Sequence, residues 1–115
     1  MKHIIHVDNS EFFRKQVKTF LTETGHYSES YSRGEEAIEA VESGNVNCVI
    51  MGLHLSDMSG EELVKRLIAY PKPVVKIVIT ASHNEDMFKR LEALGVKTII
   101  HKSGDWKSEL SRICT

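Results

Sequence analysis

The sequence predicts an α/β domain built on a parallel sheet, and three observations support this prediction. Short apolar runs rich in β-branched residues alternate with longer stretches in which apolar residues recur at helical spacing. The two kinds of segment follow one another five times, which is typical of a parallel sheet with helices on both faces and right-handed crossovers. Cap and turn residues fall at the junctions, and 115 residues suit a single domain, 1–115.

Five runs are predicted to be strands. Three of them, the first, third and fourth, are nearly continuous in apolar residues, as expected of strands buried on both faces. The second run is polar and weak, which favours an edge position. The predicted strands are His3–Val7, Tyr27–Tyr31, Asn47–Met51, Val74–Thr80 and Val96–His101.

Four apolar stripes and the residues at their ends predict the helices between these strands. Capping boxes are expected at Ser32–Glu35, Ser59–Glu62 and Ser82–Glu85. A short last helix is expected to open at Ser103. Glycines expected to end helices in a left-handed conformation are Gly25, Gly44 and Gly95. The stripes consist of Phe13, Val17, Phe20 and Leu21; Ala37, Ile38 and Val41; Leu63, Leu67 and Ile68; and Met87, Leu91 and Leu94.

Composition excludes several classes of protein. Fifteen Lys and Arg against sixteen Asp and Glu give a net charge of -1, which argues against a general nucleic-acid binder. A hydrophobic content of 41% argues against disorder, and two cysteines are too few for a disulfide framework. No signal peptide or membrane-spanning run is recognised. We therefore expect a cytoplasmic domain with no direct nucleic-acid or membrane partner.

Polar residues gather at the predicted strand ends, where open parallel sheets bind their ligands. Asp8 and Asn9 follow the first strand, and Gly52 follows the third. Thr80 ends the fourth strand and Lys102 follows the fifth. No Gly-rich dinucleotide motif follows any strand, which removes the main support for a nucleotide cofactor.

The sequence resembles the CheY-like receiver domain of two-component response regulators, essentially over its whole length. The motifs that carry the resemblance are Val7–Ser10, Val49–Gly60, Ile79–Ser82 and Ile100–Lys102. It implies a flavodoxin-like five-stranded parallel sheet with strand order 2-1-3-4-5 and helices on both faces. It also implies an aspartate after the third strand that accepts a phosphoryl group from a histidine kinase. In the family an acidic pair holds Mg²⁺, a Thr or Ser ends the fourth strand, and a Lys ends the fifth.

This chain departs from the family at several of these positions. Gly52 stands at the phosphoacceptor position and has no nucleophile, and Asn9 replaces the second acidic residue. Ile99 stands at the aromatic switch position. Only Asp8 and Lys102 remain charged, and their charges sum to zero, so we expect no catalytic residue and no cofactor, the Mg²⁺ site of the family being lost.

Other chemistry at this edge is less favoured. Asp57 lies five residues beyond the acceptor position, and Asp8 lacks metal partners, so neither is favoured as a substitute acceptor. His54, with Ser82, is expected to flank the pocket. His83 is expected to flank it too, but a transition-metal site formed by His54, His83 and Asp8 is not favoured, because no i, i+4 histidine pair supports it. A small-ligand site in the space beside residue 52 is a weaker hypothesis.

The sequence therefore predicts a non-enzymatic signalling module that acts by protein–protein contact. Thr80 and Ile99 are interpreted as a strand-end hydroxyl and a packed side chain. The expected contact face is formed by the fourth helix, fifth strand and fifth helix. A histidine kinase, an output domain or a homodimer are the partners that the resemblance implies.

The alternative is a phosphorylatable, Mg²⁺-dependent receiver whose acceptor aspartate has been replaced in this chain. Helical spacing favours a core position for Phe88, but it lies beside its apolar stripe, so exposure is the alternative, and Phe12 is similarly placed. The last helix is short for the family, which leaves open a fragment of a longer regulator.

Overall fold

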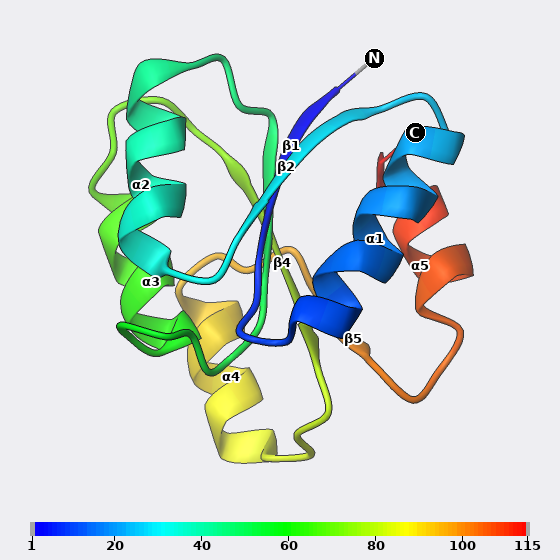
Figure 1. Ribbon diagram of the computed structural model, residues 1–115. Helices are drawn as coiled ribbons and strands as arrows, with labels where there is room; N and C mark the ends of the chain where they lie inside the picture. Colours follow the sequence, from blue (N-terminus) through cyan, green and yellow to red (C-terminus); the bar gives the residue numbers. More distant parts are fainter. Residues whose placement is uncertain (1, 115) are drawn as a thin grey trace.

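A computed structural model describes the backbone of residues 2–114 and the side chains of residues 2–113. Strands and helices alternate along this part of the chain, as predicted (Figure 1). The strands are β1 (His3–Val7), β2 (Tyr27–Tyr31), β3 (Cys48–Met51), β4 (Val75–Thr80) and β5 (Thr98–His101). The helices are α1 (Glu11–Glu23), α2 (Gly34–Ser43), α3 (Gly60–Ile68), α4 (Glu85–Ala93) and α5 (Trp106–Cys114).

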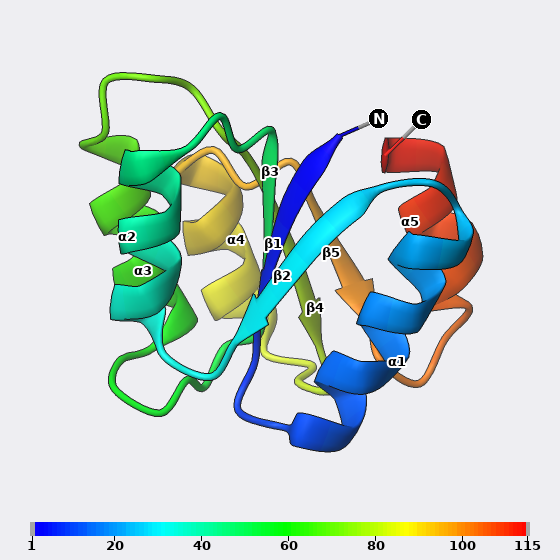
Figure 2. The ribbon, with the colours of Figure 1, turned by 45° about the horizontal axis from the view of Figure 1, so that its top comes forward.

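The five strands form one parallel sheet in the order β2-β1-β3-β4-β5. Helices α1 and α5 cover one face, and α2, α3 and α4 cover the other (Figure 2). This confirms the predicted flavodoxin-like fold and the edge position of β2. Because every strand runs the same way, the carboxyl ends of all five meet at one edge of the sheet, which brings the residues that follow them together.

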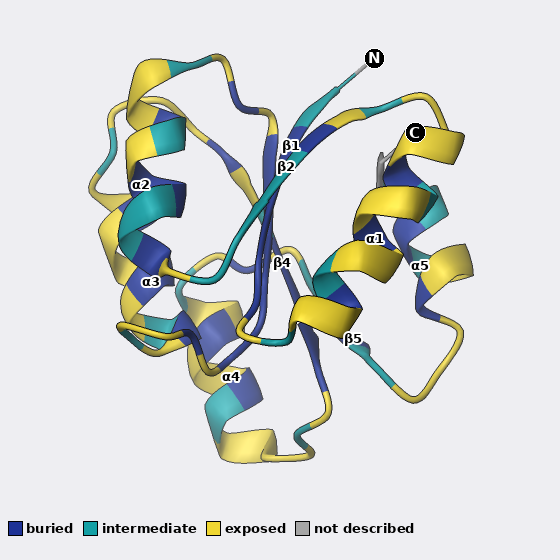
Figure 3. Cartoon of the chain, viewed as in Figure 1, coloured by how far each residue is buried: buried dark blue, intermediate teal, exposed yellow. Residues whose placement is uncertain are grey.

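Two apolar layers hold the helices on the sheet, and the buried residues follow the two faces (Figure 3). Phe13, Val17 and Leu21 of α1 pack with Trp106 and other α5 residues against one face. Residues of α2, α3 and α4 form the second layer with β1, β3 and β4. Burying one large apolar side chain stabilises the fold by about 1.5–3 kcal/mol. Burial of these stripes, rather than helix propensity, therefore holds the short helices in place.

Of the capping boxes predicted for α2 and α3, one forms and the other does not. At α3 the prediction is confirmed, because the Ser59 hydroxyl accepts the N–H of Glu62 at 3.1 Å. At α2 it is wrong: the helix has Arg33 as its N-cap, and no side chain of its own end caps it. The amides of the first turn of α2 are bound instead by Asp57, which lies on a different loop.

The predicted starts of α4 and α5 are also wrong by a few residues. Asn84, not Ser82, caps α4, because its Oδ1 accepts the N–H of Met87 at 3.0 Å. At α5 the Asp105 carboxylate accepts the N–H of Ser108 at 3.2 Å, and the helix begins at Trp106. In each case a side chain with Asn or Asp chemistry lies closer to the first apolar turn than the predicted serine.

Glycine ends two helices as predicted and fails to end a third. Gly25 and Gly95 have φ values of 85° and 99°, in the left-handed region that favours glycine. Gly44 has φ -138°, which is extended, so its predicted left-handed conformation is wrong. The chain leaves α2 in an extended path toward β3. Strands β3, β4 and β5 begin one or two residues later than predicted.

The two phenylalanines that lie beside the apolar stripes differ in exposure. Phe12 is 65% exposed on α1. Phe88 is only 6% exposed, because α4 turns it toward β5, where its ring lies edge-on to that of His101 at 5.9 Å. Within residues 2–114 no helix is long and apolar enough to cross a membrane.

Candidate functional site

A cleft of about 280 Å³ lies at the carboxyl edge of the sheet. It is where the topology brings the strand ends together, and most of the residues singled out in the sequence line it. The lining residues are Asp8, Asn9, Gly52, Leu53, His54, Ile79, Thr80, Ala81, Ser82 and Lys102. Of the predicted site residues only Ile99 lies elsewhere, packed against the apolar layer under α4.

A larger hollow of about 540 Å³ lies beside α1, away from the strand ends. Exposed side chains of α1, among them Phe12 and Lys15, line it together with Lys107. None of the buried charged groups reaches it. We therefore place the candidate site in the smaller cleft, where a carboxylate and an ammonium group meet.

Asp8 is the buried charge of the cleft. Its side chain is 2% exposed, and Oδ1 accepts the N–H of Ser10 at 2.8 Å. Its Oδ2 makes no well-aligned hydrogen bond but lies 3.1 Å from Nζ of Lys102. The Asp8 carbonyl accepts a hydrogen bond from Nη1 of Arg14 at 2.6 Å. The start of α1 and the end of β5 thus both hold this residue in place.

Lys102 is held on two sides. Its ammonium pairs with Asp8 and lies 4.6 Å from the centre of the Phe13 ring, within the range of a cation–π contact. The cleft therefore carries one negative and one positive side chain in direct contact. Losing either partner would leave a poorly solvated charge, which is costly in a protein interior.

Gly52 follows β3 and leaves space that Asp8 occupies. A Cβ atom placed ideally at residue 52 would lie 2.8 Å from Oδ2 of Asp8, closer than real Cβ contacts come. The Gly52 N–H donates to the Val7 carbonyl at 2.9 Å, so its backbone is fixed by the sheet. Any side chain at this position requires the Asp8 carboxylate to move.

Thr80 is buried and begins a series of local hydrogen bonds that leads to α4. Its hydroxyl accepts the N–H of Ser82 at 3.0 Å, and the Ser82 hydroxyl accepts the N–H of Asn84 at 3.2 Å. Asn84 in turn caps α4. This explains why Ser82 does not cap the helix: its hydroxyl fixes the loop one step earlier.

Comparison with known proteins identifies the family. Residues 4–113 match the response regulator receiver domain. The chain belongs to this family. The chemotaxis protein CheY of Treponema pallidum is 28% identical to this receiver domain over 120 residues, which cover 97% of this chain and 80% of that protein. A protein-glutamate methylesterase/protein-glutamine glutaminase of Haloarcula marismortui is 29% identical, but the match spans only 30% of its length.

Solved structures agree on the fold of the receiver domain. A CheY-like receiver domain from Methanospirillum hungatei has a TM-score of 0.90 at 22% identity and covers 99% of this chain and 91% of that one. The response regulator TrrA of Thermotoga maritima, solved with Mg²⁺ and BeF, has a TM-score of 0.84 at 25% identity, covering 99% of this chain and 97% of that one. Two-component signalling is thus the context of this receiver domain.

The cleft of this receiver domain is poorly suited to Mg²⁺, the metal that the family implies. Mg²⁺ requires several oxygen ligands in octahedral geometry. Asp8 is the one carboxylate among the lining residues, and both of its oxygens are engaged, while residue 52 has no side chain. The described residues contain no group of three His, Cys, Asp or Glu side chains that could hold a metal ion.

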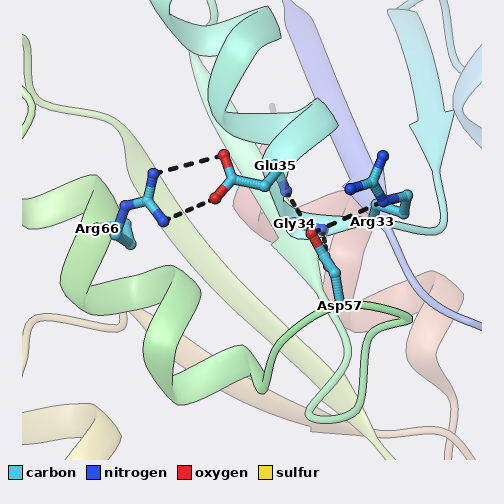
Figure 4. Close-up of polar contacts among 5 residues, drawn as sticks. All are labelled: Arg33, Gly34, Glu35, Asp57 and Arg66. Carbon is cyan, nitrogen blue, oxygen red and sulfur yellow. Dashed lines mark hydrogen bonds and ion pairs between the residues drawn. The ribbon is translucent and has the colours of Figure 1, made fainter.

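Asp57, which the sequence does not favour as a substitute phosphoacceptor, lies outside the cleft. Its carboxylate accepts the N–H groups of Gly34 and Glu35 at the start of α2, at 2.7 and 3.1 Å (Figure 4). Partial burial acts to raise the pKa of Asp57, but the Glu35 and Gly34 amides, its own backbone amide and the Arg33 charge together lower the pKa below its ordinary value. The carboxylate is therefore ionised at neutral pH and already bound.

His6 was missed by the sequence reasoning. It lies in β1, 1% exposed, and neither ring nitrogen has a hydrogen-bond partner in the described part of the chain. Burial lowers the pKa of His6 to about 4, although the nearby Asp8 carboxylate opposes this shift. The signal for its burial was present, since His6 stands inside an apolar strand run.

The other histidines do not converge on a metal site. His54 lines the cleft as predicted, whereas His83 lies outside the lining. The His83 ring instead stacks on His101 of β5, with ring centres 5.0 Å apart. This stack, with Phe88 edge-on to His101, fixes the β4–α4 loop on β5.

Proposed function

We propose that this receiver domain signals without a phosphoryl group at residue 52 and acts through protein–protein contacts. One observation carries the proposal: Oδ2 of Asp8 lies in the space that a side chain at residue 52 would need. Residue 52 stands where the family resemblance expects the phosphoacceptor aspartate. A glycine offers no oxygen to attack phosphorus.

The charges of the cleft support the same proposal. In-line transfer to a carboxylate needs a nucleophile and a divalent cation that neutralises the phosphoryl oxygens. In a cleft with several carboxylates about 5 Å apart, each pair repels by roughly 3 kcal/mol at an effective dielectric of about 20, and a cation relieves this. Here Asp8 and Lys102 neutralise one another. We infer that Mg²⁺ has no role in this domain, and that Asn9 is a solvated residue.

The switch residues favour a domain held in one state. The Thr80 hydroxyl already accepts the Ser82 amide, and Ile99 is an aliphatic side chain packed under α4. Without a phosphoryl group nothing at the cleft would favour a second position of Thr80. We infer that both residues are structural here.

Receiver domains interact with proteins such as kinases and output domains, and we propose a protein partner for this one. The face formed by α4, β5 and α5 is the proposed contact, to a histidine kinase, to an output domain or to a second copy. The chain spans about a third of the methylesterase relatives, so their esterase activity is not carried over, and we propose no enzymatic activity for it.

Exposure to acetyl phosphate and Mg²⁺, followed by intact-mass measurement, tests the proposal. We expect no phosphoryl adduct, and we expect amide NMR spectra to stay unchanged with beryllofluoride and Mg²⁺. A receiver domain that has aspartate at the acceptor position serves as the positive control. An adduct on any carboxylate of this chain would overturn the proposal.

The alternative is a phosphorylatable, Mg²⁺-dependent receiver whose aspartate has been replaced in this chain. It is favoured by the fact that Asp8, Thr80 and Lys102 still meet in one cleft. Restoring aspartate at residue 52 separates the two functions, because only the alternative predicts Mg²⁺-dependent phosphorylation of that variant.

A further inference from the structure

The loop between β3 and α3, residues 52–59, is fastened to the start of α2 by contacts that lie outside the cleft (Figure 4). Asp57 binds the N–H groups of Gly34 and Glu35, and Nε of Arg33 lies 3.9 Å from its Oδ2. The two bonded amides are 23 and 22 residues away in sequence, so this is a tertiary contact.

Helix α2 depends on this carboxylate. The first N–H groups of any helix lack partners within the helix and need an outside acceptor. Arg33, the N-cap of α2, provides no side-chain hydrogen bond. An ionised carboxylate at this end makes charge-assisted hydrogen bonds and is favoured by the helix dipole. Asp57 thus does for α2 what Ser59 does for α3 from within its own sequence.

Two further contacts join the same loop to the same junction. The N–H of Ser56 donates to the carbonyl of Ser32 at 3.0 Å. The side chain of Met58 fills the space beside Gly34, where a Cβ atom would lie 2.5 Å from its Sδ. Three successive loop residues therefore contact residues 32–35.

The ends of the same loop adjoin the cleft. Leu53 and His54 line the cleft, and the N–H of Gly60 donates to the Leu53 carbonyl at 2.8 Å. A Cβ atom at residue 60 would collide with the Gly52 carbonyl oxygen, so α3 starts in direct contact with the backbone of the cleft. The two ends of the loop are thus tied to the cleft, and its middle, residues 56–58, is tied to α2.

We propose that Asp57 is a latch that fastens the β3–α3 loop to α2, so that the cleft wall and the start of α2 move as one unit. The ion pair between Glu35 and Arg66, at 2.8 Å, extends this unit to the last turn of α3. Detaching Asp57 loosens the cleft wall as well as the helix end. The latch does not depend on the function proposed for the cleft, because none of its contacts involves Asp8 or Lys102.

Amide hydrogen exchange in Asp57→Ala tests the latch. The decisive amides are those of Ser56 and Gly60, because their hydrogen bonds do not involve the Asp57 side chain. We expect their exchange, with that of Gly34 and Glu35, to rise about tenfold, the effect of losing a helix cap on local opening. Amides of the central strands should keep their protection, which shows that the variant is folded.

Glu61→Ala is the matched control. It removes a carboxylate that pairs with Arg90 at 3.1 Å, near the same loop, without contacting α2. We expect it to leave the exchange of Ser56 unchanged. Asp57→Asn keeps the size and one acceptor oxygen, so it should give a smaller rise at the same amides, and it replaces Asp57→Ala should that variant fail to fold. Faster exchange confined to Gly34 and Glu35 would show an ordinary helix cap and overturn the latch. No change at any of the four amides would overturn it as well, because Asp57 would then not hold even the start of α2.

Discussion

The Oδ2 atom of Asp8 lies 3.1 Å from Nζ of Lys102, and the same oxygen would lie 2.8 Å from a Cβ atom at residue 52. The buried ion pair and the glycine therefore belong to one arrangement. Because Asp8 is almost fully buried, it needs the lysine nearby as its counter-charge. A side chain at residue 52 therefore requires Asp8 to shift from its present position beside Lys102.

We expect Lys102→Met to destabilise the domain by about 2 kcal/mol, because it leaves Asp8 without its ion-pair partner. The cost should stay below the roughly 3–5 kcal/mol of fully buried pairs, since Lys102 is 28% exposed. Asp8→Asn combined with Lys102→Met should cost less than the sum of the single changes, by about 1 kcal/mol or more. Urea denaturation measures all three variants, and strictly additive costs would contradict a coupled pair.

We expect Gly52→Asp not to restore Mg²⁺-dependent phosphorylation, because the new carboxylate meets Asp8 and Asn9 adds no charge to hold a cation. Gly52→Asn is the control with the same shape and no charge. The aspartate variant should be less stable than the asparagine variant by roughly 3 kcal/mol, the repulsion of two carboxylates about 5 Å apart at an effective dielectric of about 20.

Adding Asn9→Asp to Gly52→Asp should produce Mg²⁺ binding, measured by calorimetry, because three carboxylates then face one lysine. Phosphorylation of the single Gly52→Asp variant by acetyl phosphate would instead support the alternative function, a receiver that has lost only its acceptor.

We expect His6→Leu to stabilise the domain at neutral pH by about 1 kcal/mol, because two buried ring nitrogens without partners are replaced by apolar atoms. Thermal or urea unfolding at pH 7.5 measures this. His26→Leu, at a half-buried histidine, is the control and should change stability less. A marked loss of stability in His6→Leu would indicate an additional partner for the imidazole.

The benefit of His6→Leu should grow as the pH falls. The pKa of His6 is about 4 in the folded chain, below its ordinary 6.5, so between these values the unfolded chain binds the proton and the folded chain does not. Titration of His6 therefore leaves the free energy of unfolding unchanged above about pH 6.5. As the pH falls from there toward 4, it lowers that free energy by about 3 kcal/mol in total. The leucine variant should lack this loss, and parallel pH profiles of the two proteins would contradict it.

We expect Gly60→Ala to cost more stability than Gly34→Ala. At residue 60 the added methyl group meets the backbone of Gly52 and Leu53, which cannot yield without moving the cleft, so about 2–3 kcal/mol is expected. At residue 34 it meets the end of the flexible Met58 side chain, and the cost should be about 1 kcal/mol or less. Urea denaturation compares the two, and equal costs would show that the loop is less rigid than the structure indicates.

The strands could be predicted from sequence because their signal is local. Continuous apolar runs such as His3–Val7 mark strands buried on both faces, and the polar run Tyr27–Tyr31 marks the edge. Two helix ends, at Gly25 and Gly95, could be predicted because glycine favours the left-handed conformation found there. Helix starts were predicted less well, since several polar residues near each junction compete for the same amides.

The cap of α2 could not be predicted from its own sequence. Ser32–Glu35 has the pattern of a capping box, but the acceptor is Asp57, more than 20 residues away. The burial of Phe88 likewise depends on where β5 places His101. Both results depend on a neighbour that only the folded chain provides.

The sequence by itself determined the fold and the residues that meet at the strand ends. The spacing of its apolar residues marks the strands, and their common direction places Asp8, Gly52, Thr80 and Lys102 at one edge of the sheet. Only the tertiary structure decided how these residues use the space. Asp8 turns toward Lys102 and lies beside Gly52 because a buried carboxylate needs a counter-charge within contact distance, and here the glycine leaves the room to reach it.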